Sequence, residues 1–98
     1  MQKKSQMIKI ETDSDGWWWW RKDGVLHRED GPAMYRQGME RWYYEGQLHN
    51  DNGPAVIIKY NNRDNSLIYL PNKNPYRIVK KWYNHGTFIK AEVEESND

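Results

Sequence analysis

The chain has 98 residues, with six Trp, seven Tyr, one Phe and no Cys, and a formal net charge of +1. This length favours one domain with a modest core, and the lack of Cys excludes disulfides and thiolate metal sites. The balanced charge argues against a protein that binds nucleic acid by net charge alone. No apolar run has the length of a signal peptide or a membrane span, so we expect a cytoplasmic protein with no membrane partner.

The first strongly predicted strand contains four consecutive tryptophans, in DGWWWWRKDG at residues 15–24. Successive side chains of a strand point to opposite faces of the sheet, so two of the four face each way. Trp18 and Trp19 are therefore expected on opposite faces unless the strand contains a bulge.

An internal repeat of 22 residues organises the chain. WRKDGVLHREDGPAM at 20–34 aligns without a gap with WYYEGQLHNDNGPAV at 42–56, and WYNHGTFIKA at 82–91 is a third, weaker copy. Such self-similarity is typical of repeated supersecondary units. The residues that we expect to be structural in the repeat are Trp20, Trp42, Trp82, Gly24, Gly46, Gly86, His27, His49, Pro32 and Pro54.

Each copy is predicted to form short antiparallel strands joined by tight turns. The Asp-Gly pair at 23–24 favours a type I′ hairpin turn, and residues 45–46 and 84–86 take the same place in the other copies. Another turn is expected around the Gln-Gly pair at 37–38. No segment has helical periodicity. The sequence therefore predicts an all-β fold, an antiparallel β-meander or rolled sheet of six to eight strands built from about two and a half repeats.

The repeat also sets the predicted boundaries within a single domain at 1–98. We expect repeat one at 17–38, repeat two at 39–60, an insertion at 61–78, a degenerate repeat three at 79–91, and loose ends at 1–6 and 92–98.

The alignment of the copies separates the four tryptophans. Trp20 occupies a repeat position, and Trp17 aligns with apolar residues in both other copies, so both are expected in the core. Trp18 and Trp19 align with charged residues, which marks them as surplus. One interpretation is that residues 1–12 fold over the sheet face and cap the first unit. The other is that a surplus Trp is an exposed anchor for a partner or for a second copy of the chain.

The repeat resembles a known pattern, W-Y-x-x-G-x-L-H-R-x-x-G-P-A, found in short proteins of tailed bacteriophages and some other large DNA viruses. It also resembles, more distantly, the MORN repeat, a β-hairpin unit that occurs in certain bacterial antitoxins. The resemblance implies an antiparallel sheet and a protein that works by binding, with no catalytic residues. The insertion at 61–78 departs from the pattern. The matching residues are Trp42-Tyr43, Gly46, Leu48-His49 and Gly53-Pro54-Ala55, with LHREDGPA at 26–33 as the closest copy.

Two histidines invite a metal or acid–base interpretation. His27 and His49 occupy the same repeat position, so we expect each ring to bond a neighbouring turn rather than a ligand. A zinc site needs three or four convergent ligands, which this spacing does not supply. The sequence also lacks a nucleophile elbow, a phosphate loop and an HExxH motif. We therefore expect no enzymatic activity, no metal and no cofactor.

A basic stretch lies toward the C-terminus, where residues 59–90 carry seven basic side chains and one acidic side chain. Within it, basic residues beside aromatic ones could hold single-stranded nucleic acid. An ordinary solvated face that protects an edge strand, or a face for an acidic protein, would look the same. The basic residues concerned are Lys73, Arg77, Lys80 and Lys81.

The function expected from these observations is binding of another protein, by a small phage-type accessory protein that inhibits a host or defence complex. The alternatives are a single-stranded nucleic-acid module that uses residues 73–83, and a self-assembling protein that forms a homodimer. The inserted loop at 61–75 is a further place for specificity. The expected partner-binding residues are Trp18, Trp19, Tyr43 and Tyr44.

Overall fold

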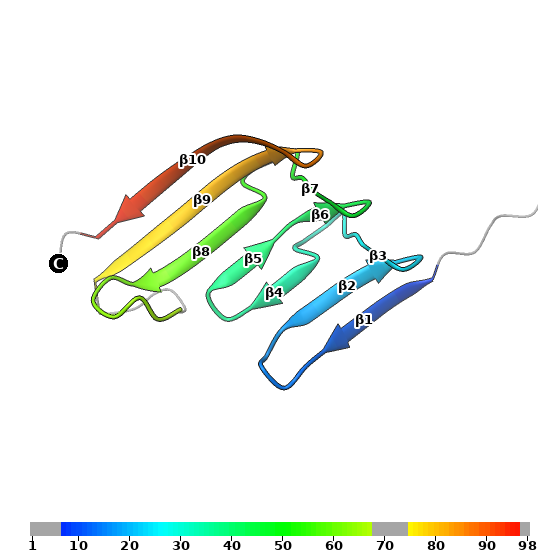
Figure 1. Ribbon diagram of the computed structural model, residues 1–98, viewed down its shortest axis with the longest axis horizontal. Helices are drawn as coiled ribbons and strands as arrows, with labels where there is room; N and C mark the ends of the chain where they lie inside the picture. Colours follow the sequence, from blue (N-terminus) through cyan, green and yellow to red (C-terminus); the bar gives the residue numbers. More distant parts are fainter. Residues whose placement is uncertain (1–6, 68–74, 97–98) are drawn as a thin grey trace, which may run out of the picture.

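A computed structural model describes residues 7–67 and 75–96, and in these residues it contains strands and turns and no helix. The all-β antiparallel meander is confirmed, and the sheet is open rather than rolled into a barrel (Figure 1). There are more strands than the six to eight predicted. β1 lies before the first repeat, and the strand expected around Trp42 is divided at that residue into β5 and β6. The ten strands are β1 (Ile8–Thr12), β2 (Trp18–Lys22), β3 (Val25–Leu26), β4 (Met34–Arg36), β5 (Met39–Arg41), β6 (Tyr43–Tyr44), β7 (Gln47–Leu48), β8 (Val56–Asn61), β9 (Tyr76–Asn84) and β10 (Thr87–Glu95).

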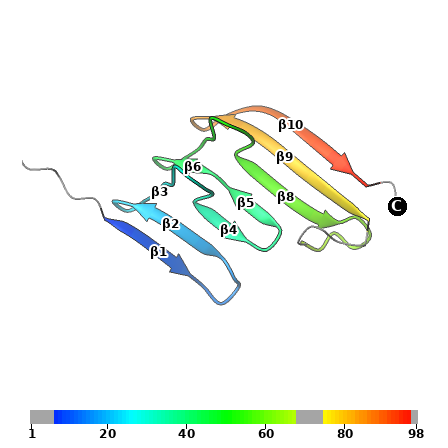
Figure 2. The ribbon, with the colours of Figure 1, turned by 180° about the vertical axis from the view of Figure 1, so that it is seen from behind.

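The main sheet has the strand order β1-β2-β4-β5-β8-β9-β10, with every neighbouring pair antiparallel. β3 pairs with the end of β2, and β6 and β7 form a separate hairpin. The principal extents are 60 × 32 × 17 Å, so the sheet is broad and thin. Seen from behind, β1 and β10 again lie at opposite ends of the sheet (Figure 2).

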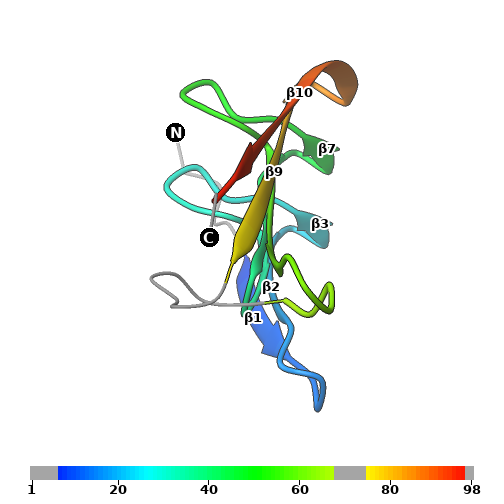
Figure 3. The same ribbon diagram turned by 90° about the vertical axis from the view of Figure 1, so that its left-hand side faces the viewer.

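Each repeat strand changes partner at its tryptophan. The Trp42 N–H donates to the Ala55 carbonyl at 2.7 Å, and the Trp42 carbonyl accepts from the His49 N–H at 2.9 Å. The corresponding bonds of Trp20 are 2.7 and 3.1 Å long. The strand therefore pairs within the main sheet before the tryptophan and within a short hairpin after it. The two loops that follow these hairpins, at 27–33 and 49–55, project to one side of the sheet (Figure 3).

Three of the turns have the backbone conformation expected from the sequence. φ is positive at both central residues of the turns at 23–24, 45–46 and 85–86, as a type I′ turn requires. At the turn between β4 and β5 only Gly38 has a positive φ, of 84°. The repeated glycine therefore serves the turn, while the residue before it accepts a less favourable conformation.

Replacing Gly46 with alanine should lower the free energy of unfolding by about 1 kcal/mol, because φ is +83° there and a Cβ disfavours that conformation. Space is not the cause, since the nearest atom to the added Cβ would be Val25 Cβ at 3.8 Å. Gly53→Ala is the matched control, because Gly53 has no positive φ and its Cβ would lie 3.6 Å from the Asn50 amide nitrogen. Urea unfolding of both variants checks the difference, and equal losses would contradict the explanation.

Few side chains are fully enclosed, as expected for a thin sheet. The buried apolar residues of the described chain are Ala33, Ala55, Val56 and Ile78. Trp17, expected in the core, is half-buried, and so is Trp20. Large apolar side chains such as Trp18, Phe88 and Val93 are more than half exposed, so apolar surface remains available for contact.

Two predicted boundaries are wrong, and so is the interpretation that the N-terminal residues cap the sheet face. Residues 8–12 do not fold over the sheet face but extend it in its own plane as β1. The tail expected to be loose from residue 92 is part of β10 as far as Glu95, which pairs with Arg77. The insertion expected at 61–78 is shorter, because Asn61 ends β8 and residues 76–78 begin β9. Residues 1–6, also expected to be loose, lie outside the described residues.

Candidate functional site

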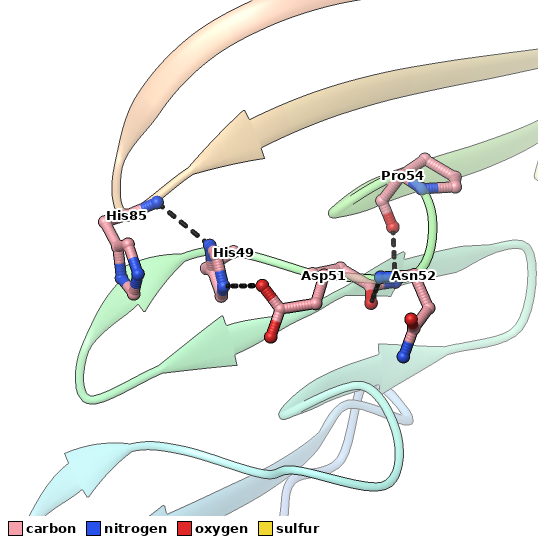
Figure 4. A network of polar contacts seen from close by, with 6 residues as sticks. His49, Asp51, Asn52, Pro54 and His85 are labelled. Atoms are coloured by element: carbon pink, nitrogen blue, oxygen red, sulfur yellow. Dashed lines mark hydrogen bonds and ion pairs between the residues drawn. The ribbon is translucent and has the colours of Figure 1, made fainter.

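The histidines of the repeat bind each unit to the next one. His27 Nδ1 accepts a hydrogen bond from the Glu45 N–H at 2.8 Å. His49 Nδ1 accepts one from the His85 N–H at 3.0 Å (Figure 4). Both rings are buried, with exposed fractions of 4% and 9%. Each ring thus bonds the turn of the following unit, as the shared repeat position predicted.

The other ring nitrogen of each histidine faces a carboxylate two residues further along the chain. His49 Nε2 lies 2.7 Å from Asp51 Oδ1, and His27 Nε2 lies 3.8 Å from a Glu29 carboxylate oxygen. Because Nδ1 accepts a backbone N–H, the proton of the neutral ring is on Nε2; His49 donates it to Asp51, whereas 3.8 Å is too long for a hydrogen bond from His27 to Glu29. The His49 ring also stacks on His85, with centroids 3.9 Å apart. Both nitrogens of His49 are thus engaged by hydrogen bonds, as is Nδ1 of His27.

The first and third copies depart from this pattern. The Asp23 N–H, in the first turn, donates to the Met7 carbonyl at 2.8 Å and not to a histidine ring. The third copy has Ile89 where the others have His, so it lacks the ring that bonds the following turn in the first two copies.

The surplus tryptophans lie on opposite faces of the sheet, as strand alternation predicted. Trp18 is in register with Tyr35 and is 51% exposed, whereas Trp19 is in register with Met34 and is half-buried. We call the face that bears the two projecting loops the loop face; it holds Trp18, Trp20, Tyr35, Lys80 and Trp82. We call the other face the arginine face; it holds Trp17, Trp19, Arg36, Arg41 and Arg77.

A groove with a volume of about 360 Å³ opens on the loop face beside Trp18. One wall is Trp20, which is covered by the Arg28 guanidinium at 4.1 Å from the ring centroid. Arg28 is itself held by the Pro32 carbonyl at 3.3 Å and by Asp30 at 3.1 Å. The groove is therefore mostly apolar, with one fixed cation at its edge. Its lining residues are Trp18, Trp19, Trp20, Arg28, Pro32, Ala33 and Tyr35.

The four residues expected to bind a partner do not form one surface. Tyr44 packs 4.6 Å from His27 and 6.1 Å from His49, between centroids, so it belongs to the contacts between units. Tyr43 is half-buried in β6, in register with Leu48. Sequence reasoning missed Tyr35 and Pro32 as neighbours of Trp18. The pairing of β2 with β4 brings Tyr35 beside Trp18, and the loop at 27–33 brings Pro32 to the same groove. The repeat alignment predicts neither contact.

The basic stretch is likewise divided by strand alternation. Arg77 and Lys81 lie on the arginine face, whereas Lys80 lies on the loop face, where it forms an ion pair with Glu94 at 3.7 Å. Lys73 lies outside the described residues. The basic stretch therefore does not form the single basic–aromatic surface that its sequence suggests.

Comparisons with models of protein families, with curated protein sequences and with solved structures found no match. No helix capable of spanning a membrane occurs in the described part of the chain. Within residues 7–67 and 75–96, no three His, Cys, Asp or Glu side chains come together as a metal site would require.

Proposed function

We propose that this protein is a non-enzymatic module that binds another protein through the groove beside Trp18. The observation that carries the proposal is the half-exposed Trp18 ring next to Tyr35 and Pro32, in a concave apolar site with one cation. Trp and Tyr dominate the binding energy of protein interfaces, especially where they border a pocket that excludes water. The groove also belongs to a rigid part of the fold, because its walls come from two paired strands and a loop held by Arg28.

The repeat resembles those of short bacteriophage proteins. This resemblance supports a partner protein that belongs to a host cell or its defence system, and inhibition of that partner when the chain covers part of its surface. The open sheet favours a second candidate, self-association, because β1 and β10 each have only one neighbour in the main sheet.

Replacing Trp18 with serine should weaken binding of the partner by roughly 30-fold or more, as expected for an interface residue worth at least about 2 kcal/mol. The partner is first captured from nuclease-treated lysate with the tagged full chain, and the purified pair is then titrated by calorimetry. Phe88→Ser is the control, because Phe88 is 54% exposed but lies in β10, away from the groove.

Equal affinities of wild type and Trp18→Ser would contradict the groove as the binding site. A partner that is captured only from lysate not treated with nuclease would contradict direct protein binding. Light scattering of the free chain identifies self-association, which would appear as a mass that grows with concentration.

A further inference from the structure

The side of the sheet opposite the groove has an unusual distribution of charge. All four arginines of the main-sheet strands point to the arginine face, whereas four of the six strand lysines point to the loop face. On the arginine face, the main-sheet strands carry six basic and two acidic side chains, a net charge of +4. The basic residues are Lys9, Arg21, Arg36, Arg41, Arg77 and Lys81, and the acidic ones are Glu11 and Glu95. The loop-face strands carry four basic and three acidic side chains, a net charge of +1: Lys22, Lys59, Lys80 and Lys90 against Glu40, Glu92 and Glu94.

Most of this positive charge is not neutralised within the described chain. Arg21 lies 3.4 Å from Glu11, but among the residues that the structure describes no carboxylate forms an ion pair with Arg36, Arg41 or Lys81. The Arg36 guanidinium instead lies over the Trp17 ring, 5.5 Å from its centroid, and its Nε is buried without a hydrogen-bond partner. The positive charges of Arg36, Arg41 and Lys81 are therefore without a carboxylate partner among the described residues.

An apolar row runs across the same face between these cations. Met39, Ile58, Val79 and Val93 are in register on β5, β8, β9 and β10. Because neighbouring strands are about 4.8 Å apart, the row is roughly 14 Å long. Val93 is 57% exposed at its outer end, and the other three side chains are half-buried.

The cations border this row closely. Arg36 is in register with Met39 and so continues the row at its inner end. Arg41 and Lys81 occupy the neighbouring row, in which Val56 lies between them. A ligand lying along the apolar row would thus meet positive charge at one end and along one side.

We propose that the arginine face binds an acidic amphipathic segment of a partner protein. Apolar side chains of the segment cover the row from Met39 to Val93, and its carboxylates bind Arg36, Arg41 and Lys81. A guanidinium matches a carboxylate with two parallel hydrogen bonds, and the Trp17 ring restricts Arg36 and Arg41 before binding. This site is on the opposite side of the sheet from the groove, so it does not depend on the function proposed for Trp18.

The chemistry of the face favours a protein segment over single-stranded nucleic acid. Nucleobases stack on aromatic rings, but the Trp17 ring is covered by guanidinium groups, and Arg77 lies over Tyr60 at 4.9 Å from its centroid. Trp19 is half-buried on this face, in register with Glu11. The row itself contains no aromatic side chain, so it offers contact to Leu, Ile or Val side chains; the exposed ring on this face, Phe88, lies at the far end of β10, beside Tyr83.

The test is selection of a displayed library of random peptides of about 16 residues, long enough to cross the row as a helix, on the full chain at about 150 mM salt. The enriched peptides should combine several Asp or Glu with Leu, Ile or Phe. Arg36→Glu/Arg41→Glu should weaken the best peptide at least about tenfold, whereas Lys22→Glu/Lys59→Glu, with the same change in net charge on the loop face, should change it less than about twofold. Trp18→Ser should also leave this affinity unchanged, which separates the site from the groove.

Val93→Asp provides a second variant at an exposed position of an edge strand, where folding is least affected, and it should weaken the same peptide. Enriched peptides without carboxylates, no enrichment at all, or equal losses in the two double variants would overturn the proposal. Tighter binding of a single-stranded oligothymidine of about 20 nucleotides than of the best peptide would assign the face to nucleic acid instead.

Discussion

Replacing His49 with alanine is expected to lower the free energy of unfolding by about 2–4 kcal/mol and the Tm by roughly 10 °C or more. The ring accepts the His85 N–H, approaches Asp51 and stacks on His85. Alanine leaves a turn N–H without its acceptor in a half-enclosed place and removes the packed ring. The loss falls on the contact between the second and third units, so it should loosen the β9–β10 hairpin first.

The matched control is His85→Ala, which removes the stacked ring but keeps the backbone N–H and its acceptor. His85 is exposed, and its substitution should cost less than about 1 kcal/mol. Urea unfolding gives both free energies, and hydrogen exchange at the amide of residue 85 reports on the local contact. If the two variants lose equal stability, stacking and not the hydrogen bond stabilises the junction.

Replacing Ala55 with leucine should lower the free energy of unfolding by about 1–3 kcal/mol, because it places extra carbon atoms where there is no room. Ala55 is 0% exposed. Its backbone is held from both sides, since its N–H donates to the Lys81 carbonyl at 2.8 Å and its carbonyl accepts from Trp42 at 2.7 Å. The backbone therefore cannot move away from a larger side chain without loss of one of these two hydrogen bonds.

Ala91→Leu is the control for this change, because Ala91 is an exposed residue of the edge strand β10. It should change the free energy of unfolding by less than about 0.5 kcal/mol. Thermal and urea unfolding of both variants test the pair. An Ala55→Leu variant as stable as wild type would show that the junction adapts its packing.

Local patterns account for what the sequence predicted correctly. The Asp-Gly pair at 23–24 specifies its turn through backbone conformation alone, and the repeat transfers that turn to 45–46 and 85–86. The bond from His27 to a neighbouring turn could also be predicted, because a histidine that recurs at one repeat position is expected to have a structural role in each unit. Alternation alone placed Trp18 and Trp19 on opposite faces.

Pairing between distant segments accounts for what the sequence did not predict. Nothing local shows that Trp18 faces Tyr35, because that register depends on the loop at 27–33. The residues from Glu92 to Glu95 look like a charged tail, and they form a strand only because β9 offers an open edge. The concentration of arginines on one face depends on the same long-range register, so a count of charge along the chain grouped Lys80 with Arg77 and Lys81, although Lys80 lies on the opposite face.

The hydrogen bonds of the repeat histidines run the same way along the chain, because each of these histidines bonds the turn of the unit that follows it. An interior unit receives its turn contacts from the unit before it and supplies the same contacts to the unit after it. The first turn uses the Met7 carbonyl as its acceptor, and the third copy has no histidine at the repeat position. Gain or loss of a 22-residue unit between them in evolution would preserve the contacts between units and widen or narrow both faces of the sheet by a fixed step.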